Sequence, residues 1–360
     1  MDNKPFFSIV MPTYAVEKYL AKAIECILDQ SFCNWELLIV DDCSPDSCGA
    51  IAERYSEKDE RIIVIHSDHN NGVSKSRNVG MLRASGDFVW FPDPDDIYER
   101  DLLERVFQSV KRYPSVPLVM FGHAENWYNR KGEFSHRVLV PFCKSGYLTR
   151  QELRDMVMNW EESTQYGYPW NKVYSLSYLK ENNILFREIS YIEDIDFNIK
   201  VFQNLPSVVL LKDILYKYAK RPSISLTGKY DSNFFNLHRE RILLLYRQQL
   251  SWNDGKISKD FYSRLGLLFC KYVVASLRMN CYSDSMMSHR ERKHWCFQLY
   301  ENSFNYSLIK QAASSNNKIF NTCIACIKRK QINLMLAIGR TAYLVERYFY
   351  PLISRLKTTT

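Results

Sequence analysis

The chain has 360 residues, of which 46% are hydrophobic and 24% charged, a composition typical of a soluble globular protein with one large or two ordinary domains. The net charge of +8 is concentrated in residues 301–360, where nine Lys and Arg stand against two acids. No run of about 18 apolar residues predicts a membrane-spanning helix. Confinement of the basic excess to the tail argues against a nucleic-acid-binding module.

Strands and helices alternate from residue 8 to residue 91. Strands are predicted at 8–12, 35–40, 61–66 and 88–91, and helices at 14–29, 48–57 and 73–84. This alternation indicates an α/β fold, a doubly wound and mostly parallel sheet with helices on both faces. Because crossovers are right-handed, the turns that follow the strands meet at one edge of the sheet.

The last strand of this series ends in three carboxylates, Asp93, Asp95 and Asp96, with two prolines that keep the segment extended. Crowded carboxylates are costly unless a cation or hydrogen bonds hold them. Mg²⁺ or Mn²⁺ uses one or two carboxylates together with substrate phosphates. The segment is therefore a candidate metal–diphosphate site, and a solvated acidic turn that caps a helix starting near Tyr98 is the alternative.

Five short motifs follow one another along the first hundred residues. They are Ser8-Ile-Val-Met-Pro-Thr-Tyr14, Gln30-Ser-Phe-Cys-Asn-Trp-Glu-Leu-Leu-Ile-Val-Asp-Asp42, Asn71-Gly72 with Ser76-Arg77-Asn78, Gly86-Asp87, and Asp93-Pro-Asp-Asp96. In this order and spacing they resemble the motifs of family 2 glycosyltransferases, densely over residues 1–110 and more sparsely up to residue 225. The resemblance implies the GT-A fold and an inverting transfer of a sugar from a nucleotide sugar.

The resemblance also implies roles for residues of the nucleotide half. Pro12, Thr13 and Tyr14 would line the nucleotide base. Asp42 would accept a hydrogen bond from the uracil imide N–H, a charge-assisted contact. Arg77 would face the nucleotide, unless it is a surface residue of its helix.

For the acidic motif, the resemblance implies a role at the diphosphate. Asp93 would lie near the ribose or the metal, Asp95 would bind Mn²⁺ or Mg²⁺, and Asp96 would cap the next helix. Some positions depart from the family pattern without removing a ligand. Ala15 stands where the family often has Asn, and Cys43 where Gly or Asn is frequent.

The second half of the predicted sheet comprises strands at 118–121, 133–140, 207–211 and 215–218. Between them, the segment Tyr168-Pro-Trp-Asn-Lys-Val-Tyr174 gathers aromatic, amide and basic side chains. The resemblance favours acceptor contacts for Trp170 and Lys172. In the plain interpretation Trp170 belongs to the core and Lys172 is solvated.

Glu193 and Asp194 open a helix predicted over 193–203, where capping is one interpretation because acids are favoured at a helix N-terminus. The resemblance implies that Asp194 is the general base and that Glu193 lies toward the acceptor. Direct displacement at an anomeric carbon needs one carboxylate near the acceptor hydroxyl and no enzyme nucleophile. Arg221, after the last strand, suits a diphosphate clamp or belongs to an ordinary surface loop.

Strand signals end near residue 230, and helices are predicted over 237–250, 259–279, 290–300 and 332–353. We expect a catalytic domain over 1–230, with a nucleotide-sugar half (1–110) and an acceptor half (111–230), and a helical region over 231–360. Asn333, Arg340 and Arg347 recur every seven residues in its basic tail. Such a helix can lie on an anionic membrane, pack against neighbouring helices or bind a second subunit.

The sequence has ten cysteines at irregular spacings, and no signal segment is recognised before the first strand. This pattern favours a cytoplasmic protein with reduced thiols. The chain is thus predicted to be a metal-dependent inverting glycosyltransferase of surface polysaccharide or capsule synthesis. Peripheral contact with the inner face of the cell membrane through the tail and contact of the tail with a partner subunit are both left open. It would move a sugar from a UDP-sugar to a glycan or lipid-linked glycan acceptor. The alternatives are a GDP- or dTDP-sugar donor, or a non-catalytic glycan-binding protein of the same fold.

Overall fold

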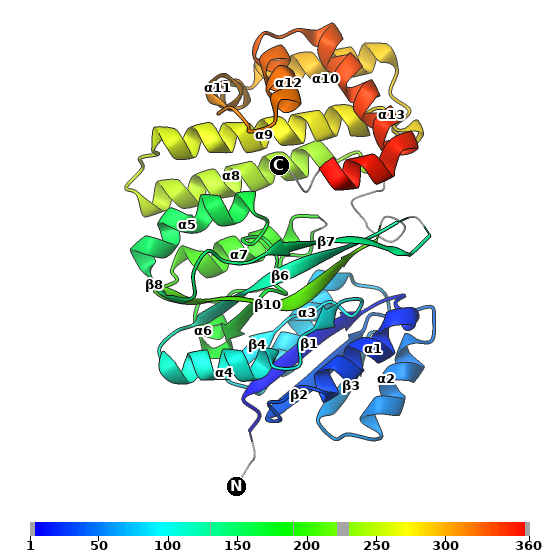
Figure 1. The fold of residues 1–360 in the computed structure, drawn as a ribbon, viewed down its shortest axis with the longest axis vertical. Helices are drawn as coiled ribbons and strands as arrows, with labels where there is room; N and C mark the ends of the chain where they lie inside the picture. Colours follow the sequence, from blue (N-terminus) through cyan, green and yellow to red (C-terminus); the bar gives the residue numbers. More distant parts are fainter. Residues whose placement is uncertain (1–3, 130, 190, 222–229, 357–360) are drawn as a thin grey trace. The chain divides into compact units, whose positions relative to one another are not determined.

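The computed structural model of the protein describes residues 4–129, 131–189, 191–221 and 230–356, with side chains up to Tyr348 in the last helix. The chain divides into two compact units, Met1–Arg221 and Pro222–Thr360 (Figure 1). Residues 222–229, beside the domain boundary expected at residue 230, lie outside the described part.

The N-terminal unit is a ten-stranded sheet with helices packed around it (Figure 1). Its strands are β1 (Phe7–Thr13), β2 (Trp35–Asp41), β3 (Ile62–His66), β4 (Phe88–Trp90), β5 (Ile97–Tyr98), β6 (Leu118–Tyr128), β7 (Phe134–Val140), β8 (Gly146–Thr149), β9 (Lys172–Ser175) and β10 (Ser207–Lys220). Its helices are α1 (Glu17–Leu28), α2 (Cys48–Ser56), α3 (Val73–Arg83), α4 (Leu102–Arg112), α5 (Arg150–Glu162), α6 (Leu176–Glu181) and α7 (Glu193–Gln203).

The sheet has the order β3-β2-β1-β4-β9-β6-β10-β5, with β7 added to β6 and β8 to β10. β3, β2, β1 and β4 are parallel, as the alternation of strands and helices predicts. β9 runs antiparallel to both β4 and β6, and β6 is parallel to β10. The predicted α/β fold is therefore confirmed, with the purely parallel part confined to the first half and a mixed second half.

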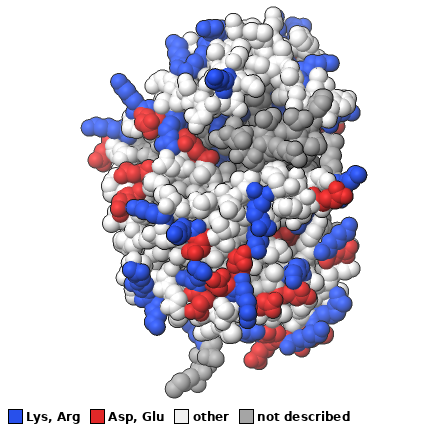
Figure 2. Space-filling model, viewed as in Figure 1, with Lys and Arg blue, Asp and Glu red and all other residues white. Residues whose placement is uncertain are grey.

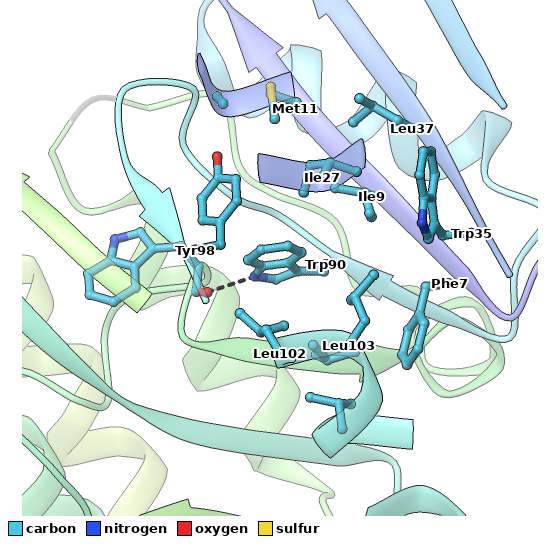
Figure 3. Packing of buried hydrophobic residues seen from close by; sticks show 14 of the residues in the cluster. Phe7, Ile9, Met11, Ile27, Trp35, Leu37, Trp90, Tyr98, Leu102 and Leu103 are labelled. Carbon is cyan, nitrogen blue, oxygen red and sulfur yellow. Dashed lines mark hydrogen bonds between the residues drawn. The ribbon is translucent and has the colours of Figure 1, made fainter. Parts of the chain in front are cut away.

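β1 is buried at every position because helices cover both faces of the central strands. On one face Phe7, Ile9 and Met11 belong to a core shared with α1, α2 and α4. On the other face Val10 meets α3. Figure 3 shows the first of these cores around Trp90, whose indole Nε1–H donates to the backbone carbonyl of Trp170 at 2.8 Å.

Two local predictions are wrong. The helix expected to start near Tyr98 starts only at Leu102, as α4, because Ile97–Tyr98 forms β5 against β10. The two strands expected at 207–211 and 215–218 are one strand, β10, with register shifts around Ile214. Such irregularities let a strand bend without ending, so the interruption in the apolar pattern marks a bulge rather than a turn.

The C-terminal unit is helical. It comprises α8 (Phe234–Trp252), α9 (Lys259–Met279), the short 3-10 turn η2 (Ser283–Ser285), α10 (His289–Glu301), α11 (Ser303–Gln311), α12 (Lys318–Lys328) and α13 (Ile332–Leu356). α9 lies at its centre and packs against α8, α11, α12 and α13. Among the described residues, no helix is both long and apolar enough to cross a membrane.

Candidate active site

The ends of β1, β2 and β4 lie at one edge of the sheet, because these strands are parallel and Thr13 pairs with Asp41. We call this edge, with Tyr14, Asp42 and the segment Asp93–Asp96, the acidic rim. Thr13 is buried at the end of β1, and Tyr14 beyond it is 48% exposed. Ligands of open α/β sheets bind at such carboxyl ends.

Asp42 fastens the start of α3 to the rim. Its side chain is buried, and its two carboxylate oxygens accept from the backbone N–H groups of Asn71 at 2.9 Å and Gly72 at 2.7 Å. Gly72 has φ +85°, a conformation that L side chains rarely adopt. A carboxylate offers about four lone-pair sites, so Asp42 keeps acceptor capacity beyond these two bonds.

Arg77 joins the rim to the start of α7. The guanidinium donates from Nη1 to Asp194 Oδ1 at 2.6 Å and from Nη2 to Asp93 Oδ1 at 3.1 Å. Its side chain is 3% exposed, whereas those of Asp93 and Asp194 are each 27% exposed. The alternative of a surface helix residue is therefore wrong. Arg77 instead holds the first acid of the Asp-x-Asp motif and the predicted base on one cation.

A second arginine meets the other acid of the motif. Arg221 Nη1 donates to the Asp95 backbone carbonyl at 3.0 Å and to its Oδ2 at 2.9 Å. The guanidinium also lies over the rings of Tyr19 and Tyr128, 4.2 and 5.1 Å from their centroids. Arg221 therefore follows the end of β10 at the acidic rim, where its guanidinium could meet an anion bound beside Asp95.

Asp96 does not cap a helix, contrary to the prediction. It is 1% exposed, and its oxygens accept from the Tyr216 hydroxyl at 2.6 Å and the Ala219 backbone N–H at 2.7 Å. Burial, together with the neighbouring Asp95 and Asp93, holds the pKa of Asp96 well above its usual range. Asp96 thus ties the acidic motif to β10 and contributes nothing to α4.

The acids of the rim repel one another. Burial raises the pKa of Asp93 to about 7, against the pull of Arg77 and with the help of Asp194 and Asp95. Burial and the adjacent Asp194 likewise raise the pKa of Glu193 to about 7. The oxygen ligands of Asp93 and Asp95 suit a hard cation, which would relieve this repulsion. Within the described ranges, however, no three His, Cys, Asp or Glu side chains gather in an arrangement that holds a metal.

Comparison with known proteins places this geometry in a family. The family model for glycosyl transferase family 2 matches residues 8–181. The uncharacterized glycosyltransferase EpsJ of Bacillus subtilis is 31% identical over 352 residues, which are 96% of this chain and 96% of EpsJ. The chain belongs to glycosyl transferase family 2.

This family 2 chain is also similar to TarS of Staphylococcus aureus, a poly(ribitol-phosphate) β-N-acetylglucosaminyltransferase. The two are 28% identical over 295 residues, 81% of this chain but 44% of TarS. The crystal structure of TarS residues 1–349 with UDP-GlcNAc superposes with a TM-score of 0.60, covering 93% of this chain and 91% of that one at 21% identity. The structural likeness confirms the GT-A fold.

Two acceptor residues predicted for this family 2 glycosyltransferase lie in its core. Trp170 is 1% exposed and stacks on Tyr216, with ring centroids 4.5 Å apart. Lys172 is fully buried, and its ammonium donates to the carbonyls of Gln165 and Tyr168 at 2.7 and 2.6 Å. Neither side chain reaches the surface. The prediction that Trp170 and Lys172 contact the acceptor is therefore contradicted by their burial. The third predicted acceptor residue, Glu193, is the first residue of α7, next to Asp194, which Arg77 joins to the rim.

The three residues predicted to line the base also differ in exposure. Pro12 and Thr13 are buried within β1, where Pro12 pairs with Val40. Only Tyr14 offers an exposed ring on which a base could stack. In this family 2 chain the backbone and Tyr14, rather than three side chains, are therefore available to a nucleotide.

Tyr216 was missed by the sequence analysis. This buried residue of β10 donates its hydroxyl proton to Asp96 and accepts from the Asp93 backbone N–H at 3.1 Å. It therefore fixes both ends of the Asp93–Asp96 segment. The available signal was a tyrosine in a strand expected to end at the same edge as the acids.

Proposed function

We propose that the protein is an inverting glycosyltransferase that moves a sugar from a UDP-sugar to a hydroxyl of a glycan or lipid-linked glycan. One observation carries the proposal: Arg77 holds Asp194, the predicted base, and Asp93, the first acid of the Asp-x-Asp motif, on a single guanidinium. A base and a diphosphate site must be this close for one sugar to lie between them.

Asp194 supplies the base of the transfer. Arg77 is bonded to Oδ1, so Oδ2 is the oxygen that would take the acceptor's proton. The acceptor oxygen forms its bond to the anomeric carbon as the bond from that carbon to the diphosphate oxygen breaks. The electron pair of the broken bond leaves with UDP, and a single displacement inverts the anomeric centre.

Asp93 and Asp95 would hold Mn²⁺ or Mg²⁺, which when bound stabilises negative charge on the leaving diphosphate. Arg221 is held at Asp95 and would bind the same diphosphate. Tyr14 would stack on the uracil, and Asp42 would accept from its imide N–H. The metal assignment rests on the carboxylate oxygens that Asp93 and Asp95 offer to a hard cation.

Surface polysaccharide synthesis is the setting that we propose. TarS, by its name, acts on poly(ribitol-phosphate), and its truncated form was crystallised with UDP-GlcNAc. A GDP- or dTDP-sugar is the competing donor, and a non-catalytic glycan-binding role is the competing function. The acids and arginines joined at the rim favour catalysis over binding alone.

Nucleotide binding distinguishes the proposed UDP-sugar donor from a GDP- or dTDP-sugar donor. UDP with Mn²⁺ is expected to raise the midpoint of thermal unfolding, and GDP and dTDP with Mn²⁺ to raise it less. A screen of UDP-sugars for donor hydrolysis then identifies the sugar. The absence of any shift with UDP would refute the proposed donor.

Replacement of the base separates catalysis from binding. Asp194→Asn is expected to lower turnover about 10²–10⁴-fold, the range of general-base catalysis, while UDP still stabilises the protein. Asp155→Asn, an exposed carboxylate on α5, is the matched control. Full turnover in Asp194→Asn would overturn the assignment of the base and leave the family unchanged.

A further inference from the structure

The outer side of α13 carries a stripe of exposed apolar residues. Leu334, Leu344 and Tyr348 are 50%, 40% and 66% exposed, with Ala337 and Thr341 between them. These positions recur every three or four residues, so they lie along one side of the helix. We call them the α13 stripe.

The opposite side of α13 is packed into the helical unit. Met335 is fully buried, and a Cβ on Gly339 would lie 2.5 Å from the backbone oxygen of Leu277 on α9. The single acid of the helix, Glu346, accepts from Arg278 and from the Tyr282 hydroxyl. The bundle thus fixes the rotation of α13, turns its carboxylate inward and leaves the stripe outward.

Basic residues border the stripe. Arg340 and Arg347 are exposed one position before Thr341 and Tyr348, so they follow one edge of the stripe. An exposed run, residues 328–330 (Lys-Arg-Lys), ends two positions before the first residue of the helix. Residues 222–360 hold 21 Lys and Arg against eight acids, whereas residues 1–221 hold 27 against 32. Figure 2 shows one face of the protein with Lys and Arg in blue. Up to Tyr348, the exposed charged residues of α13 are therefore two arginines, in a unit whose net charge is positive.

We propose that the α13 stripe docks on an anionic lipid surface. Leu and Tyr side chains enter the boundary between headgroups and acyl chains, while arginines at the edge meet acidic headgroups. A soluble polyanion would leave the apolar side chains in water. A second copy of the chain would bring two basic edges together. Docking would not depend on the identity of the donor.

The test uses the full chain and two kinds of vesicle. Because α13 packs on α9, its deletion would uncover the core of the bundle, so single side chains are replaced instead. The chain is expected to sediment with vesicles of about one third phosphatidylglycerol in phosphatidylcholine, and not with phosphatidylcholine alone. Raised salt should weaken the binding.

Two double variants divide the contributions. Arg340→Gln with Arg347→Gln is expected to weaken vesicle binding about 25-fold, since each basic residue at such a surface contributes about fivefold. Leu334→Gln with Leu344→Gln should weaken it at least tenfold. Lys256→Gln with Lys259→Gln, exposed and at the other end of α9, is the charge control and should retain binding. Unchanged circular dichroism and donor hydrolysis show that the variants fold.

Each contrary outcome overturns the proposal. Equal sedimentation of all variants would show that the α13 stripe does not contact the vesicle. Equal binding to both kinds of vesicle would remove the role of the anionic headgroup. Loss of a dimer by light scattering in the stripe variants, without any vesicle binding in the wild type, would assign the stripe to a second copy. Binding of soluble polyphosphate in place of vesicles would assign it to a polyanion.

Discussion

Two residues at the rim have a backbone conformation that their side chains disfavour. Ala15 and Cys43 have φ values of 54° and 57°, in the left-handed region. Glycine and asparagine adopt this region most readily. They are also the residues expected at these two positions from the family pattern. Ala15 and Cys43 therefore replace residues that suit the left-handed backbone found here.

Restoring asparagine at one of these positions should stabilise the protein. Ala15 is exposed, so Ala15→Asn introduces no clash, and we expect a gain of about 0.5–1 kcal/mol in the free energy of unfolding. Denaturant melts measure it. Ala50→Asn, exposed within α2, should lose stability because asparagine is a poorer helix former than alanine. A loss at both positions would contradict the argument.

Glu193 should make stability depend on pH. Its Oε2 is buried and, among the described residues, has no hydrogen-bond partner, and its pKa is raised to about 7. The folded chain therefore binds more protons than the unfolded chain between its ordinary range and about pH 7. Stability then falls as pH rises through that window.

Replacing the Glu193 carboxyl removes the free-energy cost of burying its charge at high pH. Glu193→Gln should raise the free energy of unfolding at pH 8 by about 1–2 kcal/mol and change it little at pH 4. Thermal melts across this range measure the difference, with exposed Glu60→Gln as the control. A gain that is equal at both pH values would show that charge is not the cause.

At the scale of elements, α3 carries Arg77 and is placed by its packing on β1. A Cβ on Gly80 would lie 2.3 Å from Cγ1 of Val10, which is closer than atoms can approach. Gly80→Ala must therefore push α3 away from the sheet. Because Arg77 lies about one turn before Gly80, its contacts with Asp93 and Asp194 would move as well.

We expect Gly80→Ala to cost about 1–3 kcal/mol of stability, the range for overpacked cores. UDP-sugar affinity should fall in parallel. Denaturant melts and donor titrations measure the two effects, and exposed Leu82→Ala on the same helix is the control. Unchanged stability in Gly80→Ala would mean that α3 can shift freely on β1.

The sequence predicts the first half of the sheet well. The strand Trp35–Asp41 contains the apolar run Leu37–Val40 and is closed by acids, and helices such as Val73–Arg83 lie between clear turns. Parallel order then brings Asp42 and the acidic motif to one edge. The second half was harder, because Ile97–Tyr98 and Lys172–Ser175 are too short for any period to mark them as strands.

Partners within the site were not predictable from local patterns. A segment with tryptophan, asparagine and lysine has the same composition in a sugar site and in a core. Lys172 is buried only because carbonyls four and seven residues away satisfy its ammonium. Similarly, Arg77 meets Asp194, which lies 117 residues further along the chain. The periodicity of local sequence does not predict contacts at such a separation.

At the scale of the whole molecule, the net charge of +8 conceals two opposite values. The N-terminal unit carries −5 and the C-terminal unit +13. The acids of the first unit include those of the rim, while the second unit includes the exposed arginines Arg340 and Arg347 of α13. The positive charge of this protein therefore belongs to the unit that carries the proposed lipid-docking helix, and the negative charge to the unit that carries the candidate active site.

The left-handed turn at Cys43 has one practical consequence. It leaves the Cys43 thiol exposed directly after Asp42, and Cys33 and Cys143 are the other exposed thiols of the chain. With those two changed to serine, a maleimide dye attached to Cys43 would lie at the edge of the proposed base site. Its fluorescence would then report the arrival and departure of nucleotides in real time.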